Sequence, residues 1–296
     1  MKNFNSKEIK EFVSKPLYDE KILLRRDSSY PKISIVTPSY NQAQFLERTI
    51  LSVLNQNYPN LEYIIIDGGS TDGSVEIIKK YEKYLSYWVS EPDKGQSDAL
   101  NKGFKIATGE ILAWLNADDT YLPKVLHLVV SFLKKYSNID MLYGRCYIVD
   151  SNDRILREAK TMPFSPIDYV YGLLSIPQQA AFWRRDIFLK AGPLNTKNYT
   201  CMDYELFVNF IRSGANIIYV DKLLANFRLH PQSISGSGRY NKQYKKDFVN
   251  IQYDFLGYNP NRLDILLKKL LLVIRYPTYH IRYYLSILYN RITYIR

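Results

Sequence analysis

An apolar run that ends in two adjacent carboxylates is the feature of this sequence that most directly indicates chemistry. Residues 111–115 are apolar and are followed by Asn116, Ala117, Asp118 and Asp119. The run predicts a buried strand, and two like charges at its end repel each other and are costly to desolvate. A Mg or Mn ion would resolve this conflict and would take substrate phosphates as further ligands. The pair equally fits a turn that caps the helix expected after Pro123, so this stretch alone leaves both interpretations open.

Two more predicted strands end in residues that could belong to the same site. We expect strands at 32–38, 61–66, 87–90 and 111–115, with helices between them at 43–55, 74–84 and 98–107. Strands that alternate with helices predict an α/β domain with a mainly parallel sheet flanked by helices. Ligands of such sheets bind beyond the carboxyl ends of the strands. Pro38, Asp67 and Asp118 all lie at such ends, which favours a site over a capped turn.

Size, charge and cysteine content narrow the class of protein. The chain has 296 residues, a formal net charge of +11 and a pI of about 9.3. A basic balance favours an acidic partner: nucleic acid, an anionic membrane or a phosphorylated substrate. Cys146 and Cys201 form neither a metal motif nor a disulfide framework, which fits a reducing compartment. No apolar signal-peptide core and no run of about 18 apolar residues occurs, so we expect neither a secretory leader nor a membrane span.

The pattern divides the chain into three parts. Residues 1–31 predict an N-terminal arm or helix, 32–238 the main domain, and 239–296 basic amphipathic helices. Within the last part, 263–275 is short, apolar and cationic, and a second tyrosine-rich basic helix is expected to run to Arg296. Such helices favour an anionic membrane surface. Packing on the main domain with solvated lysines is the alternative.

The order and spacing of several short motifs carry a resemblance to a known family. The motifs are 37–41 (TPSYN), 52–56 (SVLNQ), 67–74 (DGGSTDGS), 93–96 (DKGQ), 101–103 (NKG) and 115–119 (LNADD). Together they span about residues 32 to 236 and resemble the family 2 glycosyltransferases, which have the GT-A fold. The resemblance implies an inverting transfer of a sugar from a nucleotide diphosphate sugar, with Mn or Mg as cofactor.

The resemblance also assigns residues to the nucleotide-sugar site. These are Thr37, Pro38, Tyr40, Asn41, Asp67, Gly69, Gly95, Gln96, Asn101, Lys102, Asn116 and Ala117. Tyr40 is expected to stack on a pyrimidine, and Asp67 to accept the N3–H of uracil, a donor that cytosine lacks. This contact favours a UDP-sugar, with a dTDP-sugar as the second option. Asp72 equally fits a turn.

Metal binding and catalysis are expected from residues later in the chain. The family's Asp-x-Asp motif begins here with Asn116, so Asp118 is the expected metal ligand, joined by His230 of the 228–233 segment (RLHPQS). An inverting transfer needs a base on the acceptor hydroxyl. Asp203 is the candidate base, and Glu205 is the second choice. The alternative role for Asp203 is the N-cap of a helix. Gln178 and Gln179 are expected on the acceptor side, because amides suit sugar hydroxyls.

The resulting hypothesis is a transferase that builds surface polysaccharide in the cytoplasm, at the inner face of the cell membrane. Its partners would be a UDP-sugar and a glycan or lipid-linked acceptor. A nucleic-acid-binding protein explains the charge but not the acidic strand ends at Asp67 and Asp118, which would repel phosphates in the absence of a metal. The remaining alternative is a catalytically weak scaffold of the same fold that binds glycan or nucleotide.

Overall fold

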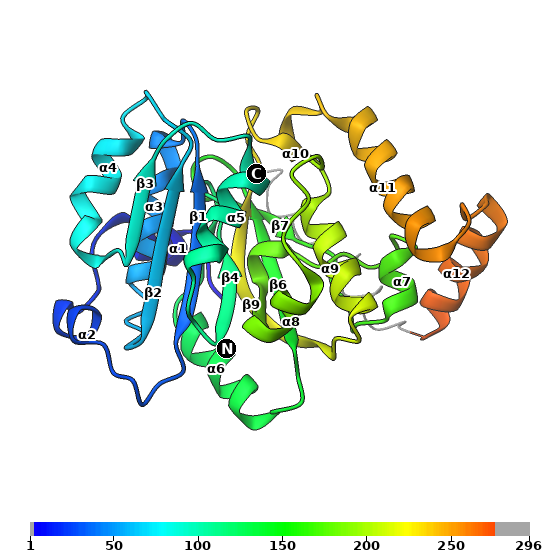
Figure 1. The fold of residues 1–296 in the computed structure, drawn as a ribbon, viewed down its shortest axis with the longest axis horizontal. Coiled ribbons are helices and arrows are strands. Elements are labelled where there is room, and N and C mark those ends of the chain that lie inside the picture. The colour runs from blue at the N-terminus through cyan, green and yellow to red at the C-terminus, as the bar shows by residue number, and fades with distance from the viewer. Residues whose placement is uncertain (1–2, 276–296) are drawn as a thin grey trace.

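A computed structural model describes residues 3–275 of the chain, and its N-terminal half is a parallel sheet (Figure 1). The four strands lie in the order β3-β2-β1-β4 and all three pairings are parallel. Their bounds are β1 (Ile33–Ser39), β2 (Leu61–Asp67), β3 (Tyr87–Ser90) and β4 (Ile111–Trp114). Ser39 is in register with Asp67, so the carboxyl ends of β1 and β2 meet at one edge, as predicted.

The connecting helices also follow the predicted pattern. They are α3 (Ala43–Leu54), α4 (Ser74–Tyr81) with the short 3-10 turn η1 (Glu82–Tyr84), α5 (Gln96–Ile106) and α6 (Val125–Lys135). Helix α5 begins two residues before the predicted start. Gly95, with φ of +105°, precedes it and supplies a backbone conformation that other residues rarely adopt.

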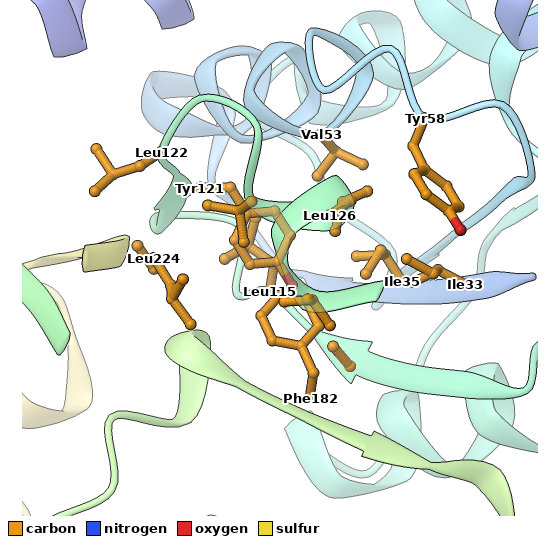
Figure 2. Close-up of a cluster of buried hydrophobic side chains, with 14 of the residues drawn as sticks. Ile33, Ile35, Val53, Tyr58, Leu115, Tyr121, Leu122, Leu126, Phe182 and Leu224 are labelled. Atoms are coloured by element: carbon orange, nitrogen blue, oxygen red, sulfur yellow. The ribbon is translucent and has the colours of Figure 1, made fainter. Parts of the chain in front are cut away.

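The sheet separates two hydrophobic cores, and alternate strand residues enter opposite ones. Ile33, Ile35 and Ala113 lie in the core under α3 and α6, whereas Val36 and Trp114 lie in the core under α5 and α9. This is the period of two that a strand imposes. Figure 2 shows the first core, where Val53 of α3 and Leu126 of α6 meet Phe182 and Leu224 from the second half of the chain.

The second half of the sheet is mixed. It consists of β5 (Thr120–Tyr121), β6 (Met141–Val149), β7 (Ile155–Glu158), β8 (Ala181–Arg184) and β9 (Ile217–Arg228). The described residues form one nine-stranded sheet, in the order β3-β2-β1-β4-β8-β6-β9-β5 with β7 on β6. Only the β6–β9 pairing is parallel in this half. The parallel sheet predicted from the sequence is therefore confirmed over β1–β4 and continues as a mixed sheet.

Helices rich in aromatic residues cover this half. They are α7 (Pro166–Val170), α8 (Arg185–Ala191), α9 (Met202–Arg212), α10 (Ile234–Ser237), α11 (Asn241–Leu256) and α12 (Arg262–Arg275), with the 3-10 turn η2 (Gln178–Ala180) before β8. In Figure 1, α11 and α12 lie at the end of the molecule opposite α2 and α4. Ile251 of α11 and Leu272 of α12 are buried in the second core.

The N-terminal arm contains α1 (Ser6–Ser14) and α2 (Glu20–Arg25). Asn5 and Glu8 form a capping box at the start of α1, and Ile9 and Val13 of this helix are buried. Asn55 of the main domain fixes the C-terminal end of α1 by donating to the carbonyls of Phe12 and Lys15. Packing thus crosses residue 31, and the division at 31 and 238 stays a prediction.

No helix among residues 3–275 is long and apolar enough to cross a membrane. The predicted second basic helix up to Arg296 lies outside the described residues. Helix α12 matches the predicted apolar and cationic segment at 263–275 almost residue for residue.

Candidate active site

A cavity of about 1380 Å³ opens at the carboxyl ends of β1, β2 and β4 and extends to α9 and α11. Most of the predicted site residues line it: Pro38, Tyr40, Gly69, Gly95, Gln96, Asn116, Ala117, Asp118, Gln178, Gln179 and Asp203. They come from segments up to 165 residues apart in the sequence, from Pro38 to Asp203. The fold thus brings the predicted donor, acceptor and base residues to one cavity.

Asp67 does not line the cavity, and its carboxylate is occupied by its own loop. Its Oδ2 accepts hydrogen bonds from the backbone N–H of Gly69 (3.2 Å) and of Ser70 (2.8 Å) and from the Ser90 hydroxyl (2.7 Å). Its Oδ1 accepts the Ser70 hydroxyl at 2.6 Å. The residue is fully buried. The predicted direct contact with uracil therefore has no support in this geometry; Asp67 instead fixes the loop that carries Gly69.

Asn41 and Asp72 also hold loops in place. Asn41 has φ of +51°, and its Oδ1 accepts the N–H of Thr71 at 2.9 Å, which joins the loops after β1 and β2. Asp72 accepts the N–H of Ala43 at 2.9 Å and the Ser74 hydroxyl at 2.6 Å. The turn interpretation of Asp72 is thereby supported, and Asn41 acts on the shape of the site rather than on its wall.

Three other residues predicted to contact the donor do not line the cavity. Thr37 is buried with its hydroxyl 3.2 Å from that of Tyr63. Asn101 exchanges two hydrogen bonds with the backbone of Leu194, at 2.8 and 2.9 Å. Lys102 forms ion pairs with Glu91 (2.8 Å) and Asp98 (3.7 Å). These three residues position the loops around the site.

Asp118 and His230 meet at the end of β4. The Asp118 Oδ2 and the His230 Nε2 are 3.0 Å apart, and the ring of His230 is buried against that of Phe45. Adjacent oxygen and nitrogen ligands of an octahedral ion with bonds of about 2.1 Å are separated by about 3 Å, so this pair fits a divalent cation. The described residues contain no group of three His, Cys, Asp or Glu side chains able to hold a metal, so remaining ligands would come from substrate and water.

Asp119 serves the structure of this loop. It is buried, and its Oδ1 accepts the backbone N–H of Arg228 at 2.9 Å. Burial, reinforced by the neighbouring Asp118 charge, raises the pKa of the Asp119 carboxyl well above its ordinary value.

Arg228, which was not among the residues predicted for the site, holds the same loop in place. Its fully buried guanidinium forms an ion pair with Asp153 at 2.6 Å. It also donates to the carbonyl oxygens of Asp118 and Asp150, each at 2.8 Å. The predicted metal loop is therefore tied to β9 and to the β6–β7 turn.

Asn116 connects two of the sequence motifs. Its Oδ1 accepts a hydrogen bond from the Nε2 of Gln96 at 2.6 Å. An aspartate at this position would add a charge to the loop, whereas the amide leaves Asp118 as the carboxylate of this loop that lines the cavity. Asp93, absent from the predicted set, also lines the cavity and accepts the N–H of Gly95 at 2.8 Å.

Asp203 lies half-buried in the first turn of α9, facing the cavity. The N-cap of α9 is Cys201, so the alternative prediction of Asp203 as N-cap is wrong. Burial raises the pKa of the Asp203 carboxyl above its ordinary value, against a lowering by the backbone N–H groups of Tyr204 and of Asp203 itself. A carboxylate with a raised pKa in a cavity suits proton transfer.

Glu205 and the glutamine pair have different surroundings. Both carboxylate oxygens of Glu205 accept amide donors, from Asn195 at 3.0 Å and Asn198 at 2.7 Å. The fallback base is thus engaged in holding a loop. Gln178 donates to the Trp114 carbonyl at 2.8 Å, which aligns η2 with the end of β4, and both Gln178 and Gln179 line the cavity.

An aromatic wall completes the cavity near Asp203, and sequence reasoning did not assign it. Tyr169, Tyr204, Tyr244 and Phe248 line this side. The rings of Tyr204 and Phe248 stack with centroids 4.7 Å apart, and Tyr169 lies 5.2 Å from Tyr204. The unusual number of tyrosines was the available signal, but the positions depend on α11, which carries no motif.

Comparison with known proteins defines the family. The model of glycosyl transferase family 2 matches residues 34–190. An uncharacterized glycosyltransferase of Mycobacterium tuberculosis is 34% identical over 167 residues, which are 56% of this chain and 63% of the relative. The chain thus spans less than two thirds of that relative's length.

Solved structures agree on the fold. The structure of S. aureus TarS in complex with UDP-GlcNAc matches with a TM-score of 0.61 and 17% identity, over 81% of this chain and 71% of the other. The mannosyltransferase PcManGT of Pyrobaculum calidifontis, in complex with GDP-Man and Mn2+, matches with a TM-score of 0.60 and 17% identity, over 89% and 75%. The fold is that of the GT-A glycosyltransferases. The chain belongs to glycosyl transferase family 2.

Proposed function

We propose that this chain is an inverting glycosyltransferase that moves a sugar from a UDP-sugar to a hydroxyl of a glycan or lipid-linked acceptor in surface polysaccharide biosynthesis. One observation carries the proposal. A single cavity holds Asp118, paired with His230, at its sheet end and Asp203, a carboxyl with a raised pKa, at its helix end. These are the two functions that an inverting transfer needs: support for the leaving diphosphate and a base for the acceptor.

In the proposed reaction Asp203 accepts the proton of the acceptor hydroxyl while that oxygen attacks the sugar on the face opposite the diphosphate. Asp118 and His230 would hold a Mn or Mg ion, which offsets the charge that develops on the leaving diphosphate. Gln178 and Gln179 lie where amide groups can orient sugar hydroxyls. The aromatic wall would reduce the access of water to the acceptor, which favours transfer over hydrolysis.

The donor is proposed to be a UDP-sugar, with a dTDP-sugar as the second option. Tyr40 is 62% exposed at the cavity wall, beside Gly68, where its ring can stack on a pyrimidine. Since the Asp67 carboxylate is occupied, discrimination of uracil would come from the loop that it shapes. One structural neighbour is in complex with UDP-GlcNAc and the other with GDP-Man.

Contact with a membrane is proposed through α12, in the basic segment that begins at residue 239. One face of this helix exposes Leu263, Leu266, Leu267, Leu270, Leu271 and Ile274, each more than half exposed. Their spacing of three and four residues places them on a single stripe. Lys268, Lys269 and Arg275 border it, which suits an anionic lipid surface. We propose that this contact keeps the enzyme at the inner face of the membrane.

The proposed activity is tested by measuring UDP release from a panel of UDP- and dTDP-sugars, with and without Mn2+. We expect metal-dependent release from at least one donor, and its loss in Asp118→Ala. If no donor yields UDP or dTDP, while UDP still raises the melting temperature by mass action, the chain is a nucleotide-binding scaffold of the same fold rather than a transferase.

A further inference from the structure

Three aromatic rings at the cavity wall are left open to a ligand. In the described part of the chain, the most exposed aromatic side chains that line the cavity are Tyr40 (62%), Tyr199 (53%) and Tyr244 (48%). Tyr40 is assigned to the base of the donor, and the ring of Tyr244 stacks on that of Phe248. Tyr199 therefore presents an exposed ring that the proposed reaction does not yet use.

The backbone on both sides of Tyr199 is held in place. Asn198 is buried, and its Nδ2 donates a hydrogen bond to a carboxylate oxygen of Glu205 in α9 at 2.7 Å. On the other side, the hydroxyl of Thr200 donates to a carboxylate oxygen of Asp247 in α11 at 2.7 Å. The ring of Tyr199 is thus exposed on a segment that two helices fix. A side chain on such a segment loses little conformational freedom when it binds a ligand.

One edge of the Tyr199 ring lies against the turn that precedes α5. A Cβ atom at Gly95 would be only 3.1 Å from the Cε1 of Tyr199, so the ring packs directly on the backbone of a residue that has no side chain. The next residue, Gln96, donates to the side chain of Asn116 at 2.6 Å, and Asn116 lies two residues before Asp118. The ring is therefore connected through this turn to the loop at the donor end of the cavity.

We propose that Tyr199 is a specificity-determining residue whose ring packs on the sugar that is transferred. The inference rests on the proposed function, in which the diphosphate lies at Asp118 and the acceptor oxygen at Asp203. Tyr199 precedes Asp203 by four residues and contacts the turn joined to the Asp118 loop, so a sugar held between the two carboxylates lies beside the ring. An aromatic face covers the C–H groups of a pyranose over apolar area. An axial hydroxyl on that face of the sugar would prevent close packing.

The test measures how much the sugar adds to the binding of the nucleotide. The full chain with Mn2+ is titrated by calorimetry with UDP-glucose, UDP-galactose, UDP-GlcNAc and dTDP-glucose, and separately with UDP and dTDP. Tyr199→Ala removes the ring, whereas Tyr199→Phe keeps the ring and removes its hydroxyl. The matched control is Tyr253→Ala, because Tyr253 is 52% exposed on α11 and does not line the cavity.

For the sugar nucleotide that the wild type binds most tightly, we expect Tyr199→Ala to lower the affinity about tenfold, the contribution of roughly 50 Å² of apolar contact. The affinity for UDP and dTDP should be unchanged, and Tyr199→Phe and Tyr253→Ala should bind every ligand like the wild type.

Three results would refute the role of Tyr199. Unchanged binding of the sugar nucleotide to Tyr199→Ala would show that the ring does not contact the sugar. An equal loss of affinity for UDP would place the ring at the nucleotide, and an equal loss in Tyr199→Phe would assign the contact to the hydroxyl. A wild type that binds none of these ligands would instead contradict the proposed function, and the inference with it.

Discussion

The two halves of the cavity are built by different means. On the sheet side, formed by β1, β2, β4 and α5, polar side chains are bonded to one another: Asp67 holds its loop with four hydrogen bonds, and Gln96 binds Asn116. On the helix side, formed by α9 and α11, stacked rings such as Tyr204 and Phe248 form the wall. The first half is fixed by a polar network and the second by the packing of large apolar surfaces.

This difference bears on what each half can recognise. A network of satisfied hydrogen bonds holds its loops in one geometry, which suits a constant group such as a nucleotide diphosphate. An aromatic wall contacts its ligand over a large apolar area that complements the shape of the ligand. Such a wall tolerates substitution of individual rings. We infer that the sheet side sets the donor and the helix side the acceptor. The following substitutions probe that division, beginning with the largest expected effect.

The substitution Asp203→Asn should lower the transfer rate by about 10²- to 10⁴-fold, the usual contribution of a general base. The amide is nearly isosteric and cannot accept the proton, so UDP affinity should be unchanged. Steady-state transfer and UDP titration measure the two effects separately.

Glu205→Gln is the matched control, because Glu205 lies two residues further in the same helical turn and its oxygens bind Asn195 and Asn198. It should alter the rate far less than Asp203→Asn does. A larger loss in Glu205→Gln than in Asp203→Asn would move the base to Glu205.

Breaking the buried ion pair beneath the metal loop should mainly affect stability. Asp153 has φ of +64°, a conformation that asparagine tolerates, so Asp153→Asn removes charge with little backbone strain. It leaves the Arg228 guanidinium buried without its anion, and we expect a loss of about 3 kcal/mol in the free energy of unfolding. Urea denaturation measures it.

Arg48→Met provides the comparison for that pair. Arg48 also binds Asp153, at 2.9 Å, but its side chain is 32% exposed, so water can replace part of the interaction and the loss should be smaller. If Arg48→Met destabilised the protein more than Asp153→Asn, the buried Arg228 pair would not be the anchor of the loop.

Removing the exposed ring at the donor end should weaken nucleotide binding moderately. Tyr40→Ala is expected to raise the Kd for UDP about tenfold, because stacking of a base on an aromatic ring contributes about 1–3 kcal/mol. Tyr87→Ala, which removes an exposed ring of β3 outside the cavity, should leave the Kd unchanged. An unaltered Kd for UDP in Tyr40→Ala would place the uracil ring elsewhere in the cavity.

The pH dependence of transfer should show the smallest but most specific effect. Asp203 must be ionised to accept a proton, so the rate falls as pH drops through its pKa. Because burial raises that pKa above the ordinary value of 3.8, the acid limb of kcat/KM should lie at a higher pH than an unperturbed aspartate gives. An acid limb at or below the ordinary value would contradict the assignment.

The sequence predicted the sheet side well because its signals are local. The β-branched strand at 33–39, whose second-last residue is Pro38, and the regular helix at 43–54 are set by neighbouring residues. Asp67 and Asp118 were found for the same reason, since Asp67 ends a strand and Asp118 lies in the loop that follows one; Asn41 was assigned through the family resemblance. Their individual roles could not be predicted from local patterns in the same way. The partners of Asp67, for example, include Ser90 from another strand.

The second half of the chain depends on distant contacts that no local pattern reveals. Strand β8 exists because Trp183 and Phe182 pair with β4 and β6 and divide between the two cores. Arg228 lies inside a recognised motif, yet its role appears only when Asp153, 75 residues earlier, is brought beside it. Tyr244 and Phe248 reach the cavity through packing of α11 on α9, which periodicity alone does not orient.

The central claim is that one cavity contains two separate parts: a donor site supported by a metal ion and a catalytic base for the acceptor. Titration of UDP into the protein with and without Mn2+ tests it most directly, for the wild type, Asp118→Ala and Asp203→Asn. The account predicts Mn-dependent binding in the wild type, its loss in Asp118→Ala and its retention in Asp203→Asn. Equal binding of UDP to the wild type and to Asp118→Ala in the presence of Mn2+ would contradict it.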